Sequence, residues 1–234
     1  MASHNQITRL IITFALIPWL MFQEKCHVCC SQDKVNLSLY YESLCPYCAD
    51  FIVNQLVKVL QTDLGSIVNL RLVPWGNTRI APNSSWICQH GTDECQINTV
   101  EACAIKVWSN LETHIKFINC VERLHLENRH SSWQSCFAAT GLSQTPIENC
   151  YNNGLGYRLE QAYADETAKL NPTHRFVPWV LVNNQPLQED YQNFIAYICR
   201  AYRGHNIPQA CKTKTLNLNI TIARDSIPRV CFRG

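Results

Sequence analysis

Residues 35–48 read VNLSLYYESLCPYC and place two cysteines, Cys45 and Cys48, where a strand pattern ends and a helix pattern begins. Apolar and polar residues alternate from Val35 to Tyr41, which is typical of a half-buried strand. Apolar residues then recur at helical spacing, and Pro46 suits the first position of a helix because its missing N–H would be unpaired there. The stretch therefore predicts a strand, a Cys-x-x-Cys turn and a helix.

A second strand pattern continues this unit. The helical spacing persists to Gly65, and a further alternating run begins at Val68 and ends at Pro74. Two strands joined by a helix form a parallel pair, so residues 35–74 predict a β-α-β unit.

The position of the two thiols favours dithiol-disulfide exchange. Unpaired N–H groups and the helix dipole stabilise a thiolate at Cys45, whereas Cys48, about one turn further, should be more buried and less acidic. We expect Cys45 to attack a substrate disulfide and Cys48 to resolve the mixed disulfide, with Pro46 and Tyr47 supporting the site. A Cys-x-x-Cys pair also serves as a structural disulfide or as half of a zinc site. We expect no metal.

Composition narrows the class of protein. The chain has 234 residues, of which 47% are hydrophobic and 16% charged, enough for one domain with an insertion. A net charge of +2 gives no reason to expect nucleic acid or an acidic membrane as a partner. Residues 1–25 predict a secretory signal peptide, with cleavage as late as residue 31. No later apolar run is long enough for a membrane span.

Cysteine usage points to an oxidising compartment. The chain has 14 cysteines, and Asn36, Asn83 and Asn219 lie in sequons as glycosylation candidates. Cleavage beyond Cys30 would remove three cysteines, and without the redox pair nine would remain, an odd number. One of them would then be free or would join two chains in a disulfide-linked homodimer, and Cys231 is the candidate.

The rest of the chain reads as a helical insertion followed by a return to the sheet. We place the domain at residues 33–202, its cysteine-rich helical insertion at about 84–154, and a tail, processed or retained, at 203–234. Within the insertion, Asn98 and Glu101 match a capping box at a helix start. A hairpin over 177–187 and a closing helix over 191–202 complete the order β-α-β, helical insertion, β-β-α.

This order resembles the thioredoxin-like α/β fold. In that fold a cis-proline precedes the third strand and faces the Cys-x-x-Cys pair, and Pro178 after Val177 matches this position. The resemblance therefore implies a cis bond between Val177 and Pro178, next to the cysteines.

A second stretch narrows the resemblance. Residues 88–103, CQHGTDECQINTVEAC, are similar to the signature of the gamma-interferon-inducible lysosomal thiol reductase family. Its fixed positions are Cys88, Gln89, His90, Gly91, Glu94, Cys95, Asn98 and Cys103. We interpret this stretch as structural, with bridge cysteines, a surface or capping histidine and a helix-capping asparagine.

The resemblance implies a function and a location. It implies a glycosylated thiol reductase that reduces disulfides of protein substrates, unfolded ones in particular, with Cys45 and Cys48 as the active-site pair. No bound cofactor is implied; a small thiol, cysteine or glutathione, would supply electrons. The destination would be the lysosome or vacuole, another part of the secretory pathway, or the extracellular space.

Acidic compartments set a condition on the thiols. A thiol of ordinary pKa, about 8.5, is almost fully protonated at pH 5, so Cys45 would need a strongly lowered pKa. We interpret Glu42 as a solvated or structural carboxylate outside the catalytic set. Two alternatives stay open: a net disulfide oxidase or isomerase, since direction depends on redox potential, and a disulfide-rich secreted binding domain with a structural Cys-x-x-Cys.

Overall fold

The computed structural model describes residues 34–214 and 229–234. The predicted signal peptide, the sequon at Asn219 and the cysteines Cys26, Cys29 and Cys30 lie outside the described residues.

The central sheet has four strands in the order β2-β1-β6-β7. They are β1 (Val35–Tyr41), β2 (Val68–Pro74), β6 (Trp179–Val182) and β7 (Gln185–Pro186). Strands β1 and β2 are parallel, with Val35 opposite Val68, and β6 runs antiparallel to β1, with Leu39 opposite Val180. The predicted β-α-β unit and the predicted hairpin are therefore confirmed.

The helix after Cys45 is shorter than the sequence pattern suggests. It consists of α1 (Pro46–Phe51), a π-helical turn (Ile52–Leu56) and α2 (Val57–Leu60), followed by a 3₁₀ turn (Asp63–Ile67). The helix ends before Gly65, whose Cβ, if present, would lie 2.2 Å from the Leu60 carbonyl oxygen. Glycine is needed there because the chain folds back onto the end of the helix.

The insertion is a small hairpin followed by helices. Its elements are β3 (Arg79–Ile80), β4 (Trp86–Ile87), α3 (Thr92–Val107), α4 (Leu111–Leu126), α5 (Ser135–Thr140) and α6 (Thr145–Asn152). The predicted capping box is wrong, because α3 begins at Thr92 and Asn98 lies in its interior. There the Asn98 side chain accepts a hydrogen bond from the Ser43 N–H at 2.9 Å, a partner distant in sequence.

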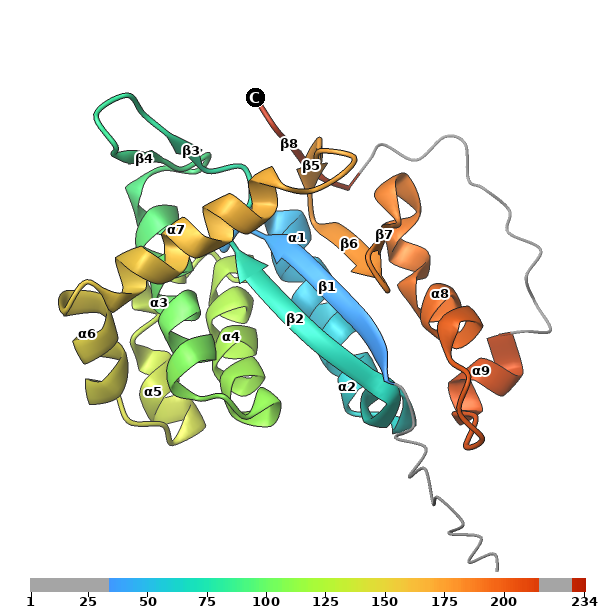
Figure 1. Cartoon of the computed structure of the whole chain (residues 1–234). Helices are drawn as coiled ribbons and strands as arrows, with labels where there is room; N and C mark the ends of the chain where they lie inside the picture. The colour runs from blue at the N-terminus through green and yellow to red at the C-terminus, as the bar shows by residue number, and fades with distance from the viewer. Residues whose placement is uncertain (1–33, 215–228) are drawn as a thin grey trace, which may run out of the picture. The chain divides into compact units, whose positions relative to one another are not determined.

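The chain returns to the sheet through α7 (Leu155–Ala168). Then follow β5 (Phe176–Val177), the hairpin, a 3₁₀ turn (Gln188–Asn193), α8 (Phe194–Ala201), α9 (Gln209–Lys214) and β8 (Cys231–Phe232). Strand β8 pairs antiparallel with β5, so the last residues of the chain lie beside the loop that leads into β6 (Figure 1).

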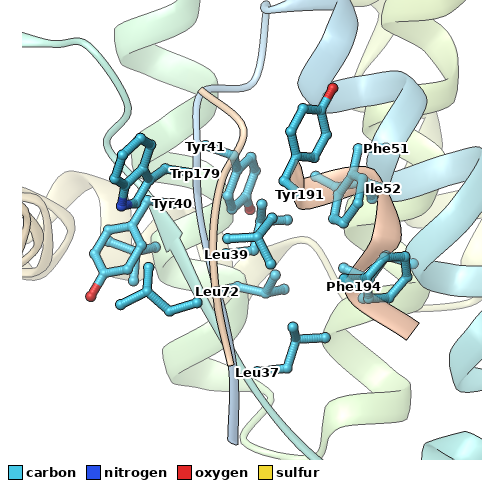
Figure 2. Packing of buried hydrophobic residues seen from close by; sticks show 14 of the residues in the cluster. Leu37, Leu39, Tyr40, Tyr41, Phe51, Ile52, Leu72, Trp179, Tyr191 and Phe194 are labelled. Atoms are coloured by element: carbon cyan, nitrogen blue, oxygen red, sulfur yellow. The ribbon is translucent and has the colours of Figure 1, made fainter. Parts of the chain in front are cut away.

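The core fills both faces of the sheet. Figure 2 shows Leu37, Leu39 and Tyr41 of β1 on the side of Phe51 and Phe194, with Tyr40 and Trp179 on the opposite side. The rings of Phe51 and Phe194 meet edge to face at 5.1 Å between centroids. On the other face, the Tyr40 hydroxyl donates to Glu166 of α7 at 3.1 Å. Side chains on both faces of β1 are buried, so helices cover both faces of the sheet.

The insertion has its own apolar cluster, and disulfides cross-link its elements. Leu44, directly before Cys45, packs in this cluster with Ile97, Val100 and Phe117. The bridges among the described residues, apart from one at the site, are Cys88–Cys95, Cys103–Cys150, Cys120–Cys136 and Cys199–Cys211. The insertion thus anchors the residue that precedes the Cys-x-x-Cys turn.

In the part of the chain that the structure describes, none of the helices has the length and apolar character that crossing a bilayer requires.

Candidate active site

Cys45 lies at the start of α1. It is the N-cap residue, in extended conformation, and Pro46 occupies the first helical turn. The Cys45 carbonyl oxygen accepts the Ala49 N–H at 3.0 Å, which closes the first turn of the helix. Pro46 is exposed and Tyr47 is partly exposed, whereas Cys45 and Cys48 are both buried. The local geometry is the one that favours a thiolate at Cys45.

The sulfur of Cys45 is bonded to Cys231 of β8, not to Cys48. Cys231 is the cysteine that the odd count leaves over, and the structure joins it to the predicted nucleophile within the same chain. With this bond in place Cys231 is neither free nor able to link two chains, which corrects the expectation for Cys231, while a homodimer as such stays a prediction. Among the cysteines of the described ranges, Cys48 alone is a free thiol.

Val177 lies beside this bond. Its carbonyl oxygen is 4.0 Å from the Cys45 sulfur, and the peptide bond between Val177 and Pro178 is cis, the isomer that the fold resemblance implies. Val177 is also a residue of β5, the strand that pairs with β8. The structure therefore brings together Cys45, Val177, Pro178 and the C-terminal strand.

Cys48 faces an environment that disfavours its charged form. Burial raises the pKa of the Cys48 thiol well above its usual range, and the Glu42 carboxylate raises it further. A hydrogen bond from the Glu42 backbone acts in the opposite direction but is a smaller effect. Cys48 is therefore held as a thiol.

Glu42 is buried, so of the two interpretations, a solvated or a structural carboxylate, the solvated one is wrong. Its Oε2 accepts the Asn77 N–H at 2.8 Å. Burial, followed by repulsion from Glu94, raises the pKa of Glu42 to about 8. Gly76, at φ +56°, makes this approach feasible, because a Cβ there would lie 2.5 Å from Oε2 of Glu42. Only glycine gives both the left-handed backbone and the space.

His90 connects Glu42 to the C-terminal strand. Its Nδ1 hydrogen-bonds to Glu94 and lies 3.5 Å from Oε1 of Glu42. Its Nε2 lies 4.0 Å from the Cys231 sulfur. The hydrogen bond with Glu94 raises the pKa of His90, and burial opposes this with a smaller effect. A partly exposed, protonatable ring therefore stands beside the sulfur that is bonded to Cys45.

The rest of the signature stretch surrounds the same place. The Gln89 N–H donates to Glu94 at 2.9 Å, and Gly91, at φ +94°, precedes α3. Cys88 and Cys95 close the loop between them, and Cys103 ties α3 to α6 through Cys150. The cysteines are bridge residues, as predicted, but Gln89, His90 and Glu94 lie at the site as well.

Sequence reasoning missed the burial of Glu42, the role of Asn77 and the partnership of Cys231. The position of Glu42, three residues before Cys45, indicates that it could lie near the site. Its burial depends on Gly76 and Asn77, more than thirty residues later in the sequence. The glycosylation candidates Asn36 and Asn83 are both exposed.

Three atoms of metal-ligand type lie within 4.8 Å of one another, on Glu42, His90 and Cys231. The Cys231 sulfur is already bonded to Cys45, which leaves two ligands. Protein zinc sites use three or four ligands, so this donor set does not fit one.

Comparison with known proteins gives consistent matches. The family model described as gamma interferon inducible lysosomal thiol reductase matches residues 36–140. The "Gamma-interferon-responsive lysosomal thiol protein" of Arabidopsis thaliana is 38% identical over 213 residues, which is 89% of this chain and 88% of that protein. The mouse "Gamma-interferon-inducible lysosomal thiol reductase" is 32% identical over 204 residues, covering 85% of this chain and 77% of that protein.

Solved structures at low sequence identity share the fold of this chain. MdbA, a thiol-disulfide oxidoreductase from Corynebacterium diphtheriae, superposes with a TM-score of 0.51 at 13% identity, covering 73% of this chain and 86% of that one. DsbA of Chlamydia trachomatis gives 0.50 at 11% identity, with coverage of 73% and 87%. These likenesses establish the thioredoxin-like fold with helical insertions.

Proposed function

Because the chain belongs to the gamma interferon inducible lysosomal thiol reductase family and is a thiol-disulfide oxidoreductase, we propose that it reduces protein disulfides at Cys45 and Cys48 under acidic conditions. One observation carries the assignment of the two cysteines. Cys45 is bonded to a cysteine of an extended strand beside the cis-proline, while Cys48 is a buried thiol on the same helix. This is the arrangement of a mixed disulfide before its resolution.

The reaction has two exchange steps. The Cys45 thiolate attacks one sulfur of a substrate disulfide; a mixed disulfide forms and the other substrate sulfur leaves as a thiolate. The Cys48 sulfur then attacks Cys45, a Cys45–Cys48 bond forms, and the second substrate sulfur leaves. The substrate gains two electrons and the cysteine pair loses two. A small thiol, cysteine or glutathione, returns them as external donor.

Acidic conditions fit the groups around the leaving sulfur. The Cys231 sulfur occupies the position of a substrate sulfur, and Nε2 of His90 is 4.0 Å from it. The raised pKa of His90 keeps the ring protonated in mildly acidic solution, so it can give a proton to a leaving thiolate. The titratable groups around it are Glu42, Glu94 and, more weakly, His125.

Glu42 favours the same pH range. Its pKa of about 8 means that at pH 5 the carboxyl is protonated and places no negative charge near Cys48. Above pH 8 it ionises and makes the Cys48 thiolate harder to form. In an acidic compartment Glu42 should therefore not slow the attack of Cys48 on Cys45.

The names of the relatives support a lysosomal destination, and we extend it to a vacuole or another acidic compartment of the secretory pathway. Unfolded proteins are the proposed substrates, because extended segments can reach buried sulfur atoms more easily than folded domains can.

The test is reduction of a denatured, disulfide-bonded protein at pH 5 and pH 7 with a small-thiol donor. Wild type should turn over substrate, faster at pH 5 relative to the uncatalysed rate, and Cys45→Ser should be inactive. A matched control, the Cys199→Ser, Cys211→Ser double variant, removes two cysteines bonded to each other outside this site. Equal turnover by wild type and Cys45→Ser would overturn the proposal in favour of a structural Cys-x-x-Cys.

A further inference from the structure

The last six residues, 229–234, lie in the site, and Cys231 and Phe232 among them form the strand β8. Cys231 pairs with Val177 and Phe232 with Phe176 in antiparallel register (Figure 1). Cys231 also forms the disulfide with Cys45. The segment is thus bonded covalently to the attacking cysteine, and it pairs as a strand with the residues before the cis-proline.

Side chains of the domain hold the backbone of this segment. Asn77 Nδ2 donates to the Cys231 carbonyl oxygen at 3.0 Å, and Gln89 Nε2 donates to that of Phe232 at 2.8 Å. The Tyr191 hydroxyl donates to the Arg229 carbonyl oxygen at 2.7 Å. Contacts to backbone groups do not depend on side-chain identity, so the same donors would serve another extended polypeptide.

One charged side chain of the segment is also bound by the domain. Arg229, two residues before Cys231, forms an ion pair with Asp50 at 2.9 Å. Asp50 lies in α1, five residues after Cys45, so the helix fixes its position relative to the attacking sulfur. Phe232 is 57% exposed, and its ring meets that of Phe176 edge to face at 6.1 Å between centroids. Val230, directly before Cys231, is buried in the apolar core, so selectivity at this edge rests on that apolar position and on a basic residue two positions before the cysteine.

We propose that segment 229–234 is a tethered substrate that occupies the polypeptide-binding edge of this enzyme, and that protein substrates with a basic residue two positions before the cysteine take its place. The inference rests on the proposed function, since it identifies what the Cys45 site binds. Release follows from exchange within the chain: Cys48 attacks the Cys45 sulfur, the Cys45–Cys48 bond forms and the Cys45–Cys231 bond breaks. Cys231 leaves as a thiolate and takes up the proton that Cys48 gives up. The small-thiol donor then reduces the Cys45–Cys48 bond by two electrons, and the freed Cys45 thiolate can attack a substrate disulfide.

The tether makes this segment a strong competitor. A linked ligand faces its site at an effective concentration of about millimolar when the linker can span the distance, above the concentration of most protein substrates. The chain is therefore latent while segment 229–234 is bound, and substrate enters when the segment leaves.

The first experiment maps disulfides in the full chain, quenched in acid with a thiol-blocking reagent and purified without reductant. We expect a peptide that links Cys45 to Cys231, and a several-fold higher initial rate of substrate reduction for Cys231→Ser and Cys231→Ala than for wild type. Thermal melting verifies that both variants fold. Finding Cys231 unlinked, or linked to a second chain, with equal rates for all three proteins, would overturn the inference.

The two failures are distinguishable. Turnover of substrate with no Cys45–Cys231 peptide would overturn the tethered substrate and leave the proposed reductase intact. A Cys45–Cys231 peptide with no turnover by any of the three proteins would make this bond a structural bridge and overturn both.

The second experiment tests selectivity in the Cys231→Ser background. Disulfide-linked peptides with the sequence Arg-Val-Cys-Phe-Arg are compared with Gln-Val-Cys-Phe-Arg. We expect kcat/KM to be about two- to five-fold higher for the arginine peptide, the value of a partly exposed ion pair. Asp50→Asn should abolish the difference, whereas Asp165→Asn, an exposed aspartate of α7, should preserve it. Equal kcat/KM for both peptides with Asp50 present would contradict the assigned recognition.

Discussion

His90 is the residue that ties the chemistry to acidic pH. Glu94 raises the pKa of His90, so its positive charge is present below that pKa and is lost as pH rises through it. We expect His90→Gln to lower the rate of disulfide reduction by up to about 10²-fold at pH 5, the lower end for a positioned acid, and much less at pH 8. The measurement is the initial rate against pH.

A matched control for this variant is His205→Gln, which replaces an exposed histidine in the segment between α8 and α9. Its pH profile should follow that of wild type. If His90→Gln lost the same factor at pH 5 and at pH 8, the ring would have a structural role, and the proton transfer to the leaving sulfur would be wrong.

At the scale of single residues, the sequence was informative where chemistry and position are local. The Cys-x-x-Cys spacing and the helix start identify Cys45 and Cys48 without any knowledge of contacts. The burial of Glu42 could not be predicted, because Gly76 and Asn77, which surround it, follow in the sequence only after α1, α2 and β2. The pairing of Cys45 with Cys231 spans 186 residues and has no local signal.

The contact between α3 and α7 gives a prediction at the scale of elements. Gly156 lies in α7, and a Cβ there would meet Thr99 Cγ2 at 2.6 Å and the Cys103 sulfur at 3.1 Å. Overpacking costs about 1–3 kcal/mol, whereas alanine gains about 1 kcal/mol over glycine in a helix. We expect Gly156→Ala to lower the free energy of unfolding by about 1 kcal/mol, measured by denaturant titration.

The rescue variant is Thr99→Ser, which deletes the clashing methyl and keeps the hydroxyl that donates to the Cys95 carbonyl oxygen at 2.8 Å. Adding it to Gly156→Ala should recover most of the loss. A Gly156→Ala protein as stable as wild type would mean that the helices do not approach this closely.

The elements themselves follow from periodicity, with one instructive exception. Strands β1 and β2 begin and end where the alternation predicts, and they pair in parallel along their whole length. Asn98 and Glu101 have the spacing of a capping box but lie inside α3. Their partners, Ser43 and the Tyr41 hydroxyl, come from the strand and loop before Cys45, and a local pattern cannot reveal such partners.

At the scale of the whole molecule, buried carboxyls predict greater stability in acid. Burial raises the pKa of Glu101 to about 8 and raises those of Glu122 and Glu160. Since the folded pKa exceeds the unfolded value, their contribution is complete below about pH 4.5 and is lost as pH rises toward 8. We expect the Tm to fall by at least about 2–4 °C, or roughly 1 kcal/mol, from pH 5 to pH 7.5.

Glu101→Gln should weaken this dependence, because the amide does not ionise and still accepts the Tyr41 hydroxyl, which donates to Glu101 at 2.6 Å. Glu112→Gln, in the first turn of α4, is the control and should leave the slope unchanged. A Tm that rises from pH 5 to pH 7.5 would contradict the burial of these carboxyls in their neutral form.

The order of elements, and hence the thioredoxin-like fold, was predictable from the whole sequence because each segment has its own period. The place of the C-terminal residues was not. They contribute two residues of strand and one cysteine, and only the three-dimensional approach of β5 gives them a partner.

The central claim is that Cys45 attacks the substrate and Cys48 resolves the intermediate. The most direct measurement is peptide mapping of the Cys48→Ser, Cys231→Ser double variant after incubation with a disulfide-bonded protein, because both internal resolving thiols are then absent. We predict a stable mixed disulfide between Cys45 and a substrate cysteine. No adduct, or an adduct on another cysteine, would contradict the claim.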